Sequence, residues 1–257
     1  MTPGAPIVVL ATPGHSTNAL VNRLAEHFAE VHLLLEEPEG RWFFVRRRAK
    51  RIGWAKVLGQ VAFIVGVVPL LERAGAARVV EIAREHNLSF SNPAVPTTRV
   101  ASVNDPETSA LVAARKPAAV VLSGTRIVKG HVLTAIDAPT LNIHDGITPA
   151  YRGVHGGYWA LVRDDPDRCG VTVHVVDPGV DTGPVVGQAR VELTERDGYA
   201  TLPSLQAAAA LPILVDALTR IVSGQALDPI RAGGESRQWY HPTAWEYVRH
   251  RVGRGIR

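Results

Sequence analysis

The sequence predicts an α/β protein with a doubly wound, mostly parallel sheet, followed by a short C-terminal α+β extension. Apolar, β-branched runs alternate with helical patterns, which is typical of a parallel sheet with helices on its faces. The chain also starts with a β-α-β unit, which favours a right-handed crossover between parallel strands. Its 257 residues, 46% of them hydrophobic, are enough to bury a substantial core.

The amino-terminal unit contains a strand, a helix and a second strand. Residues 6–12 form an apolar, β-branched run of the kind that is buried on both faces of a sheet. Apolar residues recur at helical spacing over 18–30, and Ser16 or Thr17 is the predicted N-cap of this helix. Residues 31–37 complete the unit as the next strand.

Residues 40–75 interrupt this alternation and resemble an insertion of two helical pieces. Gln60 and Pro69 break its apolar part, which we therefore expect to be too short to span a membrane. The insertion is either a core helix or a helix that contacts a membrane surface through residues 41–72. The second interpretation uses the cations at its polar end, which are Arg46, Arg47, Arg48, Lys50 and Arg51. An exposed apolar insertion or tail would also allow two chains to pair as a homodimer.

The remaining elements continue the α/β pattern. We expect further helices at 76–87, 106–117, 128–136, 156–164 and 199–224. We expect further strands at 118–124, 139–144, 169–177 and 183–193. The last two strands should form a hairpin. Residues 1–192 then make up the main domain, including the insertion, and residues 193–257 form a helix and tail that pack on it.

Composition limits the compartment and the partners. Cys169 is the only cysteine, so no disulfide forms within the chain and a reducing cytoplasm is expected. The start of the sequence lacks the features of a secretory signal. The net charge of +4 is concentrated in residues 41–51 and 248–257, either as a solvated face or as a site for phosphate-bearing or acidic partners. Without a zinc motif, a recognition helix or an aromatic RNA-binding signature, no nucleic-acid partner is expected.

Polar residues cluster where the predicted strand at 139–144 ends. Ligands of α/β sheets bind beyond the carboxyl ends of the strands. Alternate residues of a strand share one side, so Asn142 and His144 should face one cleft together. Asp181 follows in a segment rich in turn signals, which presents its carboxylate on a constrained loop. His174 lies in an alternating strand and is interpreted as a packed core histidine.

These residues belong to a longer series of spaced motifs. The series consists of Asn142-Ile143-His144, Pro149, Tyr151-Arg152-Gly153, Gly170-Val171-Thr172-Val173-His174 and Asp181-Thr182-Gly183-Pro184. It resembles the folate-dependent formyltransferases, which include the glycinamide ribonucleotide, methionyl-tRNA and sugar N-formyltransferases. The resemblance covers roughly residues 6–38 and 98–192, and it implies the Rossmann-like fold of that family.

The resemblance implies 10-formyltetrahydrofolate as formyl donor and Asn142, His144 and Asp181 as catalytic residues. Formyl transfer to an amine passes through a tetrahedral intermediate with a negative oxygen, to which Asn142 and His144 would donate hydrogen bonds. Asp181 would favour a charged imidazole and relay a proton from the amine. No metal is required. The implied folate contacts are Leu122, Ser123, Gly124, Arg126, Ile127, Val128, Val180, Thr182 and Gly183.

The acceptor is predicted to be a small molecule with a primary amine, with an amino sugar or a nucleotide-linked sugar as the leading candidate. The predicted acceptor contacts are Gly14, Ser16, Thr17, Arg152, Gly153 and His155. The glycine-rich phosphate loop of the purine-pathway members is interrupted here by residues 15–17. Residues 145–149 replace the usual Pro-Ser-Leu-Leu-Pro loop, and the region after residue 192 is expected to be too small for a tRNA-binding barrel.

Three alternatives stay open beside this interpretation. A glycinamide ribonucleotide formyltransferase would use that ribonucleotide as acceptor. A 10-formyltetrahydrofolate hydrolase would turn over folate without any amine. A non-catalytic ligand-binding or membrane-associated module would retain the fold only, against which the presence of Asn142, His144 and Asp181 argues.

Overall fold

The computed structural model describes residues 5–38 and 40–256. Its centre is a seven-stranded sheet with the order β3-β2-β1-β4-β5-β7-β8. The strands are β1 (Ile7–Ala11), β2 (Val31–Glu36), β3 (Thr97–Val100), β4 (Ala119–Ser123), β5 (Thr140–His144), β7 (Gly170–Val175) and β8 (Val185–Arg190). The strands from β3 to β5 in this order are parallel, whereas β7 and β8 are antiparallel to their neighbours. This mixed, mostly parallel sheet confirms the predicted fold class.

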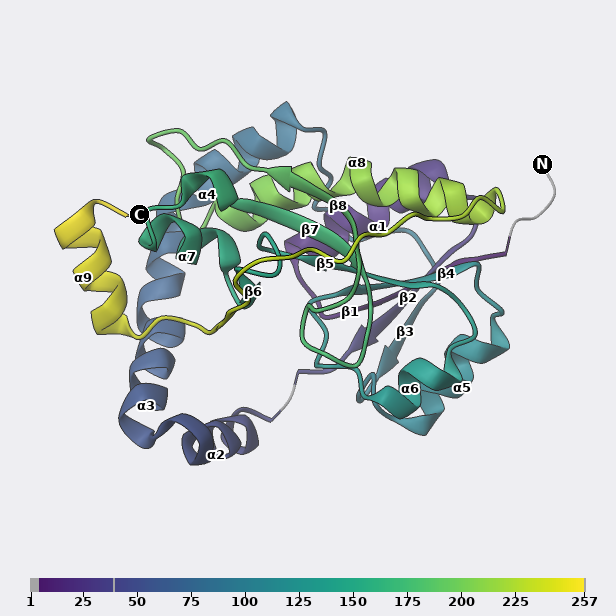
Figure 1. Ribbon diagram of the computed structural model, residues 1–257, viewed down its shortest axis with the longest axis horizontal. Helices are drawn as coiled ribbons and strands as arrows, with labels where there is room; N and C mark the ends of the chain where they lie inside the picture. Colours follow the sequence, from purple (N-terminus) through teal and green to yellow (C-terminus); the bar gives the residue numbers. More distant parts are fainter. Residues whose placement is uncertain (1–4, 39, 257) are drawn as a thin grey trace.

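Helices cover both faces of the sheet (Figure 1). On one face lie α1 (His15–His27) and α8 (Leu202–Val222), and on the other lie α5 (Pro106–Ala114) and α6 (Gly130–Ala135). A short helix, α7 (Gly156–Val162), and a 3-10 turn (Pro166–Arg168) precede β7. The sheet is therefore doubly wound, with its ligand-binding edge free of these covering helices.

The first strand explains why the sheet needs both layers. Ile7 and Val9 belong to the apolar core that includes α1 and α8. Val8 and Leu10 belong to the core that includes α5 and α6. Because all four side chains are fully buried, an uninterrupted apolar run was a reliable signal for this strand.

Two details near the amino terminus and the sheet edge differ from prediction. Helix α1 begins at His15 with Gly14 as its N-cap, and the Thr17 hydroxyl donates to the Thr12 carbonyl at 2.7 Å instead of capping the helix. Strand β3 was not predicted. It is an edge strand with mostly polar, partly exposed side chains, so it lacks the apolar run that marks a buried strand.

The insertion forms α2 (Arg41–Ile52), α3 (Trp54–Ala62), a π-helical turn (Phe63–Val67) and α4 (Val68–Glu85). From α3 to α4 the helical run is continuous, so the predicted break near residue 75 is absent. The π-helical turn ends at Val67, two residues before Pro69. The proline ring and the missing N–H of Pro69 prevent a regular α-helical bond to the Val65 carbonyl, which accounts for the local widening.

Within residues 5–38 and 40–256, two helical runs are long and apolar enough to cross a membrane, judged by length and composition alone. One is Leu202–Val222, which is α8 and packs against the sheet. The other is Trp54–Glu85, which exceeds the length expected from the sequence because the helix continues through Pro69. Its far end is tied to the domain, since Ile82 is buried and Arg78 pairs with the enclosed Asp197 carboxylate at 3.1 Å.

The tail ends in a helix that the sequence analysis did not predict, α9 (Ala244–Arg254). It starts with a capping box. The Thr243 hydroxyl accepts a hydrogen bond from the Glu246 N–H, and the Glu246 carboxylate accepts one from the Thr243 N–H. These reciprocal bonds define where the helix begins.

The tail packs on the insertion at one end of the molecule (Figure 1). Before α9, strand β9 (Gln238–Trp239) pairs in parallel with β6 (Arg152–Gly153). Gly59 of α3 allows the Trp245 indole of α9 to approach closely, because a Cβ at this position would lie 2.1 Å from the ring. Insertion and tail therefore form one structural unit beside the sheet.

Leu214→Ala should lower the free energy of unfolding by about 2–5 kcal/mol, because Leu214 is fully buried between α8 and the sheet and its removal leaves a cavity. Urea denaturation measures this change. The matched control is Val222→Ala at the exposed end of the same helix, which should cost less than about 1 kcal/mol. Equal losses in both variants would contradict the packing of α8 described above.

Candidate active site

A cavity of about 530 Å³ opens at the carboxyl ends of β4 and β5. Its wall combines the loops after β4, β5 and β7 with residues of the insertion and of the tail. Parallel strands of α/β sheets place ligand sites at this edge. The volume lies within the range of small-molecule sites.

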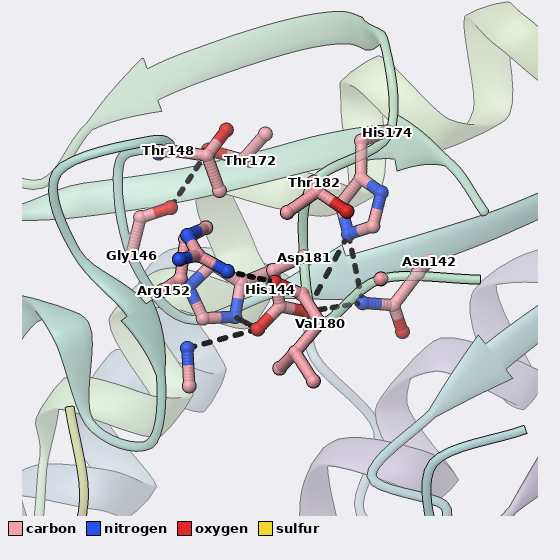
Figure 2. A network of polar contacts seen from close by, with 12 residues as sticks. Asn142, His144, Gly146, Thr148, Arg152, Thr172, His174, Val180, Asp181 and Thr182 are labelled. Atoms are coloured by element: carbon pink, nitrogen blue, oxygen red, sulfur yellow. Dashed lines mark hydrogen bonds and ion pairs between the residues drawn. The ribbon is translucent and has the colours of Figure 1, made fainter. Parts of the chain in front are cut away.

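Asp181 is the centre of a polar network on this wall (Figure 2). One carboxylate oxygen accepts a hydrogen bond from the Gly153 N–H at 2.9 Å and lies 3.3 Å from Nδ1 of His144. The other oxygen lies 3.4 Å from the Asn142 amide nitrogen and 3.6 Å from Nε2 of His174. Four residues from three segments of the chain therefore converge on one carboxylate.

These contacts favour the ionised carboxylate. Burial opposes ionisation of Asp181, but the charge of His144 and the hydrogen bond from the Gly153 N–H act against burial. The net effect holds the pKa of Asp181 below its usual value. Asp181 is therefore an anion at neutral pH.

Both ring nitrogens of His144 face oxygen atoms. Nε2 donates to the Tyr151 carbonyl at 2.6 Å, and Nδ1 faces the Asp181 carboxylate at 3.3 Å. This arrangement is fully satisfied when both nitrogens carry hydrogen. The expectation that His144 donates directly to a ligand oxygen therefore needs revision, because both of its N–H groups already have partners within the protein.

Asn142 and His174 are direct neighbours across β5 and β7. Nδ1 of His174 donates to the Val175 carbonyl at 2.9 Å, which leaves Nε2 to accept from the Asn142 amide at 3.1 Å. His174 is buried, as expected for a core histidine, yet its ring lines the cavity and belongs to the polar network. The strand register that pairs it with Asn142 places it there, and the sequence does not state this register.

The loop after β5 is fixed by the two antiparallel strands (Figure 2). The Thr172 hydroxyl donates to the Gly146 carbonyl at 2.7 Å and accepts from the Thr148 N–H at 3.1 Å. The Gln188 amide donates to the Thr148 carbonyl at 2.9 Å. Gly146 is required here, because a Cβ would lie 2.2 Å from the Tyr151 carbonyl oxygen. The loop thus holds the backbone acceptor of the imidazole in place.

The loop that carries Asp181 is held by two further contacts. The Asp177 carboxylate accepts from the Thr182 hydroxyl at 2.6 Å. The Arg152 guanidinium donates to the Val180 carbonyl at 2.7 Å (Figure 2). Thr182 and Arg152, which the sequence predicts as ligand contacts, therefore use their side chains to shape this loop.

Most of the predicted folate contacts lie on the cavity wall. Those that line it are Leu122, Gly124, Arg126, Ile127, Val128 and Val180. Ser123, Thr182 and Gly183 do not line it. The Arg126 guanidinium is directed away from the cavity, towards Glu36 at 3.3 Å and the Glu37 carbonyl, so its side chain fixes the loop rather than meeting a ligand.

Some of the predicted acceptor contacts line the cavity and others lie outside it. Gly153 and His155 line the cavity, whereas Arg152 does not. Gly14, Ser16 and Thr17 lie at the turn between β1 and α1, outside the cavity wall. The reason is that the loops after β4 and β5, and not this turn, enclose the cavity.

His155 is held as a neutral imidazole. Its backbone is left-handed (φ 54°), and its Nε2 accepts a hydrogen bond from the Tyr199 hydroxyl at 2.5 Å. Burial, with a smaller effect from His241, lowers the pKa of His155 to about 3. His155 therefore offers polar atoms without charge to the cavity.

Asp145 is a cavity residue that the sequence analysis did not select. Within the described ranges 5–38 and 40–256, no hydrogen-bond partner contacts its carboxylate. Burial raises the pKa of Asp145, His144 opposes this effect, and the neighbouring Asp181 adds to it. The site therefore contains a second carboxylate that is poorly stabilised as an anion.

The insertion and the tail supply a further part of the wall, none of whose residues the sequence analysis selected as ligand contacts. Arg48 and Ile52 come from α2, and Gln238 and Tyr240 come from the tail. The Arg48 guanidinium lies 4.9 Å from the centre of the Tyr240 ring, and its Nε donates to Gln60 at 2.8 Å. A cation and an aromatic ring thus stand opposite the Asp181 network.

The fold and site together define an α/β protein whose ligand cavity carries an acid–base network. The chain matches the family model described as formyl transferase over residues 55–218. It is 33% identical over 189 residues to a methionyl-tRNA formyltransferase of Anaeromyxobacter dehalogenans, a match that covers 68% of this chain and 60% of that protein.

Solved structures share the fold. Glycinamide ribonucleotide transformylase 1 from Symbiobacterium toebii superposes with a TM-score of 0.59 at 21% identity, over 90% of this chain and 93% of that one. A sugar N-formyltransferase from Shewanella superposes with a TM-score of 0.57 at 13% identity, over 91% of this chain and 75% of that one.

The chain belongs to the formyl transferase family, because the family model covers more than half of it. It spans about 60% of the length of the methionyl-tRNA formyltransferase that it matches. The family region includes α3 and α4 of the insertion and ends within α8.

Asp145→Asn should raise the melting temperature at pH 7.5. The folded-state pKa of Asp145 is raised, so ionisation costs stability once the pH exceeds the ordinary aspartate pKa of about 3.9. The gain should therefore vanish as the pH falls towards 4. Thermal unfolding at both pH values measures it, with the exposed Asp137→Asn as matched control. A loss of stability at pH 7.5 would contradict the assignment.

Proposed function

We propose that the chain transfers a formyl group from 10-formyltetrahydrofolate to the primary amine of a small acceptor, an amino sugar or a nucleotide-linked sugar. The observation that carries the proposal is the convergence of Asn142, His144 and Asp181, with contacts of 3.3 and 3.4 Å, on the wall of one cavity. Membership of the formyl transferase family supports the reaction type.

The donor half of the cavity suits a folate. Leu122, Ile127 and Val128 give it an apolar wall, and Ile127 is 62% exposed without a ligand, so a flat ring would cover it. Glu36 fixes this segment, because its carboxylate accepts from the N–H groups of Arg126 and Val103, each at 2.9 Å. When bound, the folate supplies the activated formyl carbon.

Asp181 acts as the base in this proposal. As a largely enclosed anion it attracts a protonated amine and accepts the proton that the amine must lose. Asp145 adds a second carboxyl group to the same wall, and a protonated amine bound beside it would favour its ionised form. The two residues together favour an amine over a neutral hydroxyl as the attacking group.

His144 and Asn142 stabilise the negative charge that develops on the formyl oxygen. His144 acts through the charge of its imidazole and passes the proton on Nδ1 to or from Asp181. Asn142 is the direct donor. Its 3.4 Å contact with Asp181 is the weaker of its two, so this N–H can turn to the oxygen while the bond to His174 persists.

The wall formed by the insertion and the tail supports an acceptor with anionic and flat parts. Arg48 provides a positive charge, and Tyr240 provides a ring against which a sugar or base can stack. His155 and Gln238 add neutral polar atoms suited to hydroxyl groups. A nucleotide-linked amino sugar combines these features.

Asp181→Asn and His144→Ala should each lower kcat by about 10²–10⁴-fold, because each removes a group that moves a proton or carries charge in the reaction. Release of tetrahydrofolate in the presence of an amine acceptor measures the rate. His131→Ala, an exposed histidine on α6 outside the cavity, serves as control and should keep the wild-type rate. Near-normal turnover by either site variant would refute the assigned roles.

An acceptor screen tests the substrate class. Amino sugars, nucleotide-linked amino sugars, glycinamide ribonucleotide and methionyl-tRNA are each incubated with the donor, and mass spectrometry detects the added formyl group. We expect nucleotide-linked amino sugars to be formylated, and Arg48→Gln to raise KM for them by about tenfold, since a charged hydrogen bond is lost. Donor turnover without any acceptor would indicate a hydrolase instead.

A further inference from the structure

We propose that the outer side of the insertion and tail binds the surface of an anionic lipid membrane. The surface, called here the apolar face, consists of Trp54, Leu58 and Val65 from the α3 run and Trp245, Val248 and Val252 from α9. Each of these side chains is between 52% and 82% exposed. Single exposed apolar residues are ordinary, but a contiguous group of this kind marks an interaction surface.

The apolar face is regular rather than scattered. Trp54, Leu58 and Val65 follow helical spacing along one side of the run. On α9, Trp245 and Val252 each lie about one turn from Val248, while the opposite side of the helix is buried against the fold. Packing inside the protein explains the buried sides of these helices and leaves the outward sides without a partner in the described chain.

The two helices join into one surface. Trp245 packs over Gly59 of α3, and its indole remains 56% exposed. Figure 1 shows α3 and α9 together at the end of the molecule that lies away from the central sheet. A flat partner can therefore contact both helices at once.

The charges around the apolar face match an anionic surface. Residues 40–71 contain seven Lys and Arg residues, of which Arg48 lines the cavity, and no Asp or Glu. On α9, the single acidic residue, Glu246, is used in the capping box, whereas Arg249 and Arg251 are exposed. Tryptophan and cations around an apolar stripe are the composition of helices that lie in the membrane interface.

A second copy of the chain fits this surface less well. Pairing two identical faces would bring the cations of both copies together, which is unfavourable where water is excluded.

The helical run Trp54–Glu85 is also better suited to lie on a membrane surface than to cross the membrane. Its far end is anchored in the domain by Ile82 and by the ion pair of Arg78 with Asp197.

Co-sedimentation with vesicles tests the proposal. The wild-type chain should bind vesicles of phosphatidylcholine mixed with phosphatidylglycerol at least about tenfold more tightly than vesicles of phosphatidylcholine alone, and added salt should weaken the binding. A variant with Leu58→Gln, Val65→Gln and Val252→Gln should lose at least about tenfold in affinity. A variant with Lys50→Gln, Lys56→Gln and Arg249→Gln should lose the preference for anionic lipid.

The matched control carries Val222→Gln and Ile230→Gln, two exposed apolar residues away from the apolar face, and should bind like the wild type. Circular dichroism confirms that each variant is folded. The proposal is overturned if the wild type binds neither vesicle, or if the control loses as much affinity as the apolar-face variant. It is also overturned if ultracentrifugation finds a dimer that the apolar-face variant dissociates. These outcomes do not depend on the proposed formyl transfer.

Discussion

The rest of the site depends on the contacts that the Asp181 carboxylate makes with its neighbours. An anion with only 13% of its side chain exposed is costly unless donors surround it. The donors come from β5 and β6, in the form of Asn142, His144 and the Gly153 N–H. The carboxylate therefore connects strands that are distant in sequence, and the same contacts that stabilise its charge also aim the imidazole and the amide at the cavity.

The insertion and the tail connect this site to the outside of the molecule. Gln60, which interrupts the apolar run in the sequence, is buried and links the two segments, since it accepts from Arg48 at 2.8 Å and donates to the His241 carbonyl at 2.6 Å. The inner side of this unit completes the cavity, and the outer side carries the apolar face. One inserted structure thus supplies part of the cavity wall and carries the surface that we propose for membrane binding.

The sequence predicted the parallel sheet well because its central strands are buried on both faces and read as apolar runs. It failed at β3, where the strand is polar, and at α9, where a basic tail conceals a helix with a capping box at Thr243. In the site, the motif spacing predicted that Asn142, His144 and Asp181 belong to one site, and in the structure the three side chains are in contact. It could not identify Asp145, Arg48 or Tyr240, because their place on the cavity wall depends on tertiary packing.

The central claim is that Asp181 is held as an anion by its neighbours. Carbon-13 NMR of the labelled aspartate carboxyl groups, with Asp181 assigned through the Asp181→Asn variant, tests it directly. As the pH falls from 8, the Asp181 signal should titrate with a midpoint below the ordinary aspartate pKa of about 3.9. A midpoint above this value would contradict the account.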